Sequence, residues 1–238
     1  MSRSITIARR EFYSYLFSPI AYVAMFLFLL VTGILFRKDF EAGQPAAMRT
    51  ILEWMVWLLV VIIPLLCMGL ISQEWATGTI ETLMTAPVDE ADVVVGKFIG
   101  SFLLLWLMLI PTLLYVIMLR IKANVDYGPI FSGYLGILLV GGLFIAVGLF
   151  CSSLTRSQIV AAVTTMAILF AITILPWWVT GEATLKPWAR TLADQAVFRR
   201  YTDFAKGVID IGNFVFFVAA TGVFLFLTTK VLESRRWK

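Results

Sequence analysis

Residues 73–97 read QEWATGTIETLMTAPVDEADVVVGK and form a polar, acidic stretch between two hydrophobic segments that are each long enough to cross a bilayer. The hydroxyl group of Thr79 can cap the start of a helix and Pro87 cannot continue one, so the stretch predicts a short helix over residues 79–86. Gly78, directly before this helix, allows a tight turn of the backbone. The sequence therefore predicts a short helix held between two membrane spans.

One face of this short helix is expected to be apolar. Ile80, Leu83 and Met84 stand at positions i, i+3 and i+4, which lie on the same side of a helix. A helix with such a face can lie in a groove of a partner protein. We interpret residues 73–97 as the segment through which another protein moves the membrane part of the chain.

The composition indicates a membrane protein. Hydrophobic residues make up 61% of the 238 residues and charged residues 14%, whereas soluble domains have roughly 45–50% apolar and 25% charged residues. The predicted spans use about half of the chain, so the loops are too short to hold a soluble catalytic domain, which needs at least about 50 residues. Any source of energy for this protein is expected to lie on another subunit.

The predicted fold is an all-α polytopic membrane protein that forms one domain over residues 1–238. Residues 2–17 have apolar positions at helical spacing with arginines between them, which predicts an N-terminal helix lying in the membrane interface. Six hydrophobic segments have the length of a transmembrane helix, and an even number places both termini on one side. The predicted spans are residues 19–36, 54–72, 98–119, 130–151, 157–179 and 212–230.

Two short external helices are expected between the fifth and sixth spans. Lys186-Pro187-Trp188 is predicted to begin the first, because proline fits the first turn of a helix. Phe198–Lys206 is predicted to form the second, with Gly207 as the residue that ends it.

A set of residues in the loop resembles the E-x3-GT-x-E-x-L-x3-P…GK pattern of type-2 ABC transporter permeases. Residues 198–210 (FRRYTDFAKGVID), followed by a hydrophobic span and the tail LESRRW, are similar to the end of permeases of the gliding-motility and copper-site-assembly branch. Gln73 stands where this pattern leads us to expect a basic residue. The matching residues of the loop are Glu74, Gly78-Thr79, Glu81, Leu83, Pro87 and Gly96-Lys97.

The resemblance implies that residues 73–97 contain a coupling helix that docks on a separate ATP-binding subunit. It also implies a location in the cell inner membrane with both termini cytoplasmic, and a second permease, either a second copy of this chain or a different one. An envelope or substrate-binding accessory protein is a further possible partner. The residues expected to contact the ATP-binding subunit are Glu74, Gly78, Thr79, Ile80, Glu81, Leu83, Met84 and Pro87.

The charges of the chain do not indicate a nucleic-acid partner. The net charge is +4, but the 19 Lys and Arg residues are scattered among the ends of the hydrophobic segments and form no basic stripe. They divide almost evenly between the two sides of the predicted spans, so their number does not fix the orientation. The compact basic clusters at both termini favour a cytoplasmic position for the ends, in agreement with the resemblance.

Several kinds of chemistry are missing from the sequence. The chain has no His, and the six predicted spans contain no Asp, Glu, Lys or Arg except Lys230, the last residue of the sixth, which argues against a proton- or ion-coupled carrier. Gly96-Lys97 lacks the glycine spacing of a P-loop, so ATP and Mg²⁺ are expected on the partner subunit and no cofactor on this chain. Cys67 and Cys151 are expected to be free thiols. We do not expect this chain to be an enzyme.

Three functions remain open from the sequence. The first is the permease subunit of an ATP-driven exporter, and the second is the same architecture transmitting ATP-driven motion to an envelope partner without flux of a small solute. The third is a passive channel or structural membrane protein, which the near absence of charged residues in the spans disfavours. The same absence favours an amphipathic, lipid-linked or bulky apolar cargo, but the sequence does not name the cargo, the direction of transport or the composition of the pore.

Overall fold

The computed structural model describes residues 3–41, 47–78, 89–122, 126–180 and 197–236. This part of the chain is helical and contains no strand. The longer helices are α2 (Pro19–Glu41), α3 (Ala47–Cys67), α6 (Glu90–Leu109), α8 (Tyr127–Leu154), α9 (Gln158–Thr180) and α12 (Ile211–Arg236). The shorter ones are α1 (Arg3–Leu16), α4 (Ser72–Thr77), the 3₁₀ turn η1 (Ile110–Thr112), α7 (Leu113–Lys122) and α11 (Val197–Ala205).

Helix α8 lies at the centre of the bundle. Its most apolar segment is 78% buried, compared with 61% for the segment that contains α3 and 17% for α12. Small residues on α8 let the neighbouring helices approach closely. A methyl group added at Gly148 would lie 2.7 Å from Cys67 Cβ of α3, so a larger residue there would separate α8 from α3.

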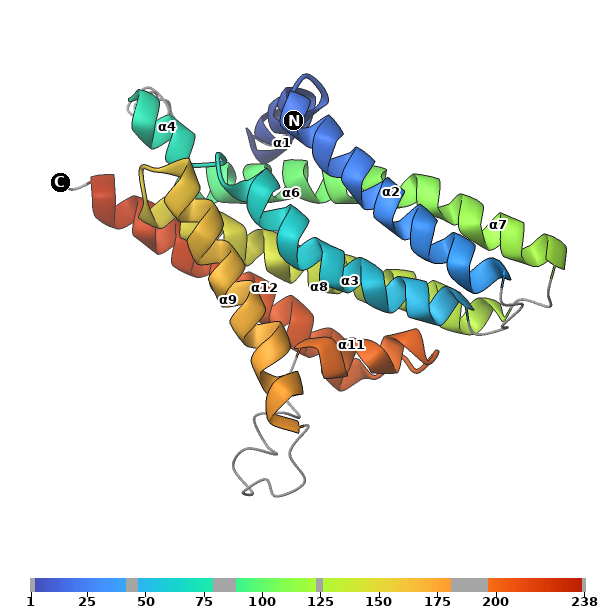
Figure 1. The fold of residues 1–238 in the computed structure, drawn as a ribbon. Helices are drawn as coiled ribbons and strands as arrows, with labels where there is room; N and C mark the ends of the chain where they lie inside the picture. Colours follow the sequence, from blue (N-terminus) through green and yellow to red (C-terminus); the bar gives the residue numbers. More distant parts are fainter. Residues whose placement is uncertain (1–2, 42–46, 79–88, 123–125, 181–196, 237–238) are drawn as a thin grey trace.

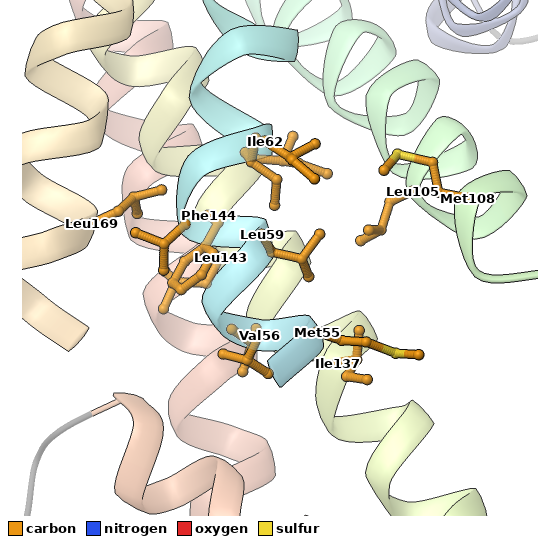
Figure 2. Close-up of a cluster of buried hydrophobic side chains, with 14 of the residues drawn as sticks. Met55, Val56, Leu59, Ile62, Leu105, Met108, Ile137, Leu143, Phe144 and Leu169 are labelled. Carbon is orange, nitrogen blue, oxygen red and sulfur yellow. The ribbon is translucent and has the colours of Figure 1, made fainter. Parts of the chain in front are cut away.

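The core joins all six long helices, and Figure 2 draws the part of it where four of them meet. In Figure 2, side chains of α3 point on one side toward α6 and on the other toward α8 and α9. Cys67 and Cys151 lie within this buried cluster as free cysteines. The labelled core residues are Met55, Val56, Leu59 and Ile62 of α3, Leu105 and Met108 of α6, Ile137, Leu143 and Phe144 of α8, and Leu169 of α9.

Within the described residues, five segments are long and apolar enough to cross a membrane: Pro19–Lys38, Met48–Thr77, Glu90–Ile121, Tyr127–Leu154 and Ile211–Ser234. They identify a multi-pass membrane protein. The fifth predicted span, residues 157–179, coincides with α9, whose residues Gln158–Thr173 count as a shorter apolar helix. The fifth predicted span, and with it the total of six, therefore stays a prediction.

The helix around residues 98–119 is longer than the predicted span. Glu90–Ile121 covers 32 residues, or about 48 Å at 1.5 Å per residue, which exceeds a hydrocarbon core of about 30 Å. Pro111 lies in η1, between α6 and α7. At the other end, Glu90 and Asp92 in the first turn stabilise the helix dipole, so residues 90–97 of the expected loop are helical.

Figure 1 shows the start of α1, helix α4 and the end of α12 at one end of the bundle. Helix α1 packs against α6, and α11 packs against α8. Helix α11 occupies nearly the range predicted from residues 198–206, and Gly207 follows it with a φ of 91°. The helix predicted to begin at Lys186-Pro187-Trp188 lies outside the described residues.

Candidate functional site

The structure describes only part of the predicted coupling segment. Glu74 lies on α4 and Gly78 ends that helix. The other predicted contact residues, Thr79, Ile80, Glu81, Leu83, Met84 and Pro87, lie outside the described residues.

Helix α4 is a short helix that the sequence pattern did not predict, because six residues are too few for a recognisable hydrophobic period. It ends at Gly78, which has a φ of 72° and so lies in the left-handed region. A residue with a Cβ costs about 1–2 kcal/mol in this conformation. The glycine of the predicted motif thus serves to end α4 with a left-handed turn of the backbone.

Ser152 of α8 holds the start of α4. Its Oγ accepts hydrogen bonds from the backbone N–H groups of Ile71 and Ser72, each at 3.1 Å, and donates to the Met68 carbonyl at 3.1 Å. Ser152 is fully buried, and its side chain satisfies N–H groups that the first turn of a helix leaves unpaired. Sequence reasoning missed this residue, because a serine 80 positions away gives no local signal.

Lys97 connects α4 to α1 by two ion pairs. Its Nζ lies 2.9 Å from Glu74 Oε1 and 3.4 Å from Glu11 Oε2. The Lys97 side chain is only 3% exposed, whereas the two carboxylates are about one fifth exposed. The two ends of the 73–97 stretch are therefore joined to each other and to α1. We call Glu11, Glu74 and Lys97 the ion-pair junction.

Two glycines bring α1 against the first turns of α6. A methyl group at Gly96 would lie 2.7 Å from Ile7 Cβ and 2.9 Å from the Ser4 carbonyl oxygen, and one at Gly100 would lie 2.8 Å from Glu11 Cβ. These distances are too short for a real Cβ, so both positions require the smallest side chain. The close approach of the two backbones is what lets Glu11 reach Lys97.

Tyr15 fixes the other end of α1. Its hydroxyl donates to the Leu66 carbonyl at 3.2 Å and lies 3.0 Å from Ser101 Oγ. Ser101 Oγ in turn donates to the Lys97 carbonyl at 3.0 Å. Burial raises the pKa of the Tyr15 phenol well above its usual value near 10, so the hydroxyl keeps its proton. Through these bonds α1 contacts α3 and α6 together.

Gly100→Leu is expected to separate α1 from α6 and to destabilise the purified chain by about 1–3 kcal/mol, the usual cost of overpacking a tight contact. Thermal unfolding in detergent measures the effect. Gly222→Leu on α12 is the matched control, because nothing lies within 4 Å of a Cβ placed there. Equal changes in the two unfolding temperatures would contradict the proposed role of Gly100.

The geometry makes the junction a mechanical connection. Helix α4 is held by α8 through Ser152 and by α6 through Lys97, while Lys97 also holds α1. A force applied to the segment after Gly78 would reach three other helices of the bundle through these contacts.

Comparison with known proteins identifies the family. A family model described as ABC-2 family transporter protein matches residues 5–234. No curated protein matches the chain. The gliding-motility and copper-site-assembly branch stays a prediction from residues 198–210. Because the family match covers nearly the whole chain, and because five of its helices are long and apolar enough to cross a membrane, this protein belongs to the ABC-2 family of transporter proteins and is a permease subunit of an ABC transporter.

Proposed function

We propose that this chain forms half of the pore of an ATP-driven exporter, in which a separate ATP-binding subunit docks on residues 74–87. The second half of the pore is a second permease, either another copy of the chain or a different one. Lys230, at the end of the sixth span, is the one charged residue of the predicted spans, and this scarcity of charge supports an amphipathic, lipid-linked or bulky apolar cargo.

The ion-pair junction is the observation that carries this proposal. The docking segment begins at α4, and Glu74 on α4 is bound to a lysine that is almost completely buried in α6. A loop that only joined two spans would have no need to bury a charged lysine between two carboxylates, since burying charges costs several kcal/mol per ion. The junction therefore suits a segment that transmits force into the membrane helices.

The purified permease is expected to hydrolyse no ATP by itself and to show ATPase activity only with its co-expressed ATP-binding subunit. The reason is that the chain has neither the phosphate-binding loop nor the Mg²⁺ ligands of a P-loop ATPase. The measurement is phosphate release by the permease alone and by the co-purified complex. Hydrolysis by a preparation shown to contain only this chain would refute the assignment.

We place both termini and residues 73–97 in the cytoplasm of a cell with an inner membrane. The basic clusters at both ends and the family resemblance support this orientation. In a chain whose buried Cys67 and Cys151 are replaced by serine, single cysteines at Ala47 and Thr184 should react with an impermeant thiol reagent added to cells with a permeabilised outer membrane. A cysteine at Glu90 should stay unlabelled, and its labelling from outside would reverse the orientation.

A second candidate function is transmission of ATP-driven motion to an envelope partner. Helix α11 favours it, because this helix is firmly attached to the bundle: Ser132 Oγ of α8 donates to the Phe204 carbonyl at 2.7 Å, and the Phe198 ring lies 4.9 Å from the Trp57 ring. An attached external helix could pass motion to a protein outside the membrane. Co-purification of an envelope protein that is lost on deletion of residues 197–205, with no solute flux in vesicles, would favour this function over export.

A further inference from the structure

A small open pocket lies beside the ion-pair junction. Its volume is about 120 Å³, and it is bordered by α1, the start of α2, the end of α3 and the residues where α4 and α9 begin. Six polar residues supply much of its lining: Glu11, Ser14, Tyr15, Ser18, Gln73 and Gln158. A water molecule takes about 30 Å³ of liquid volume, so the pocket has room for a small polar group.

The charges of the lining select a cation. Glu11 is the only charged residue among the described residues that line the pocket. Its partner Lys97 is shared with Glu74, so the ion-pair junction keeps one net negative charge. The serine hydroxyls and the amide oxygens of Gln73 and Gln158 add hydrogen-bond acceptors. An anionic group would meet the net negative charge of the junction, whereas an ammonium group would meet acceptors on several sides.

The lining also distinguishes between two kinds of ammonium group. A quaternary ammonium has no N–H and is usually bound by several aromatic rings, but Tyr15 is the single aromatic residue among the described residues of this lining. A primary ammonium has three N–H donors and needs acceptors around it. The pocket therefore fits a primary ammonium.

The position of the pocket indicates which kind of molecule carries the ammonium group. Ile20 and Leu65 line it and are also exposed on the apolar surface of α2 and α3, at 48% and 36%. Helix α1, which supplies Glu11 and Ser14, is amphipathic. A ligand with a polar head and apolar tails could place its head among the polar residues and its tails along α2 and α3. Arg10 stands one helical turn before Ser14 and is exposed, which suits contact with a phosphate at the mouth.

From these observations we propose that the pocket binds the ammonium headgroup of phosphatidylethanolamine. The same chemistry would accept free ethanolamine, so the test must separate the lipid from the free amine. The proposal concerns a lipid site between α1, α3 and α9 and is independent of the docking of an ATP-binding subunit.

The experiment measures binding of phosphatidylethanolamine, phosphatidylglycerol and free ethanolamine to the purified full-length chain by native mass spectrometry. Phosphatidylethanolamine is expected to bind more tightly than phosphatidylglycerol with the same acyl chains, and free ethanolamine is expected to bind far more weakly. Gln73→Lys should weaken binding of phosphatidylethanolamine by about fivefold or more, since two unit charges about 4 Å apart repel by at least that factor even in a water-like dielectric.

Ala76→Lys is the matched control, because Ala76 is exposed on the same helix and does not line the pocket. If Gln73→Lys does not fold, Gln158→Lys takes its place in the test, because it adds the same charge to the lining from α9. Equal binding of the two lipids would contradict the proposal that this pocket binds the ammonium headgroup. Equal effects of the lining and control lysines would contradict it as well. Binding of free ethanolamine as tight as that of the lipid would overturn the assignment to a lipid.

Discussion

Lys97→Met is expected to destabilise the purified chain by about 3 kcal/mol, at the lower end of the range for removing one partner of a buried ion pair. The lysine is 3% exposed, and its removal leaves Glu11 and Glu74 next to each other without the cation that they share. Glu74 Oε2 is already buried without a hydrogen-bond partner among the described residues, so this carboxylate has no other group there to compensate for the loss. The unfolding temperature in detergent measures the effect.

Two comparisons test the cause of this destabilisation. Lys230→Met removes a lysine whose pair with Glu233 has about half of each side chain exposed, and it should cost only about 0–1 kcal/mol, as is usual for surface pairs. Adding Glu11→Gln and Glu74→Gln to Lys97→Met removes the two charges as well and should restore most of the stability. If the triple variant is as unstable as Lys97→Met, the lysine acts through packing and not through charge.

The membrane helices could be predicted from the sequence because their cause is local. A run of about 20 apolar residues is enough to indicate a helix in a bilayer, and the helices of the structure appear in the predicted order. The helices also extend beyond the predicted spans. Helix α3 begins at Ala47 and not at residue 54, and α6 begins at Glu90 and not at residue 98, because a helix continues past the bilayer where the next residues also favour it.

The ion-pair junction could be predicted only in part. Glu74 and Lys97 were singled out by the motif, but the sequence did not show that they contact each other across 23 positions. Glu11 and Ser152 were missed altogether. Their roles depend on the close packing of α1 on α6 and of α4 on α8, and such packing becomes visible only when distant segments are placed together in space.

The coupling segment itself provides the second large expected effect. Leu83→Arg is expected to abolish co-purification of the ATP-binding subunit. If residues 79–86 occupy a groove, the apolar face of Ile80, Leu83 and Met84 supplies most of the burial, and one leucine-sized side chain contributes about 1.5–3 kcal/mol. An arginine in its place loses this term and adds the cost of burying a charge, which is far larger when no partner is present.

Glu81→Gln is the matched comparison on the same segment, because a charge at the rim of an interface contributes only about 0–1 kcal/mol. It should leave most of the ATP-binding subunit attached. Gly78→Trp should act differently from both: the side chain would strain the left-handed turn at a φ of 72° and misdirect the segment that follows, so the complex would form but its ATPase rate would no longer respond to the permease. If Leu83→Arg and Gly78→Trp change neither co-purification nor the ATPase rate, residues 73–97 serve only to connect two spans, and the force must enter the bundle elsewhere.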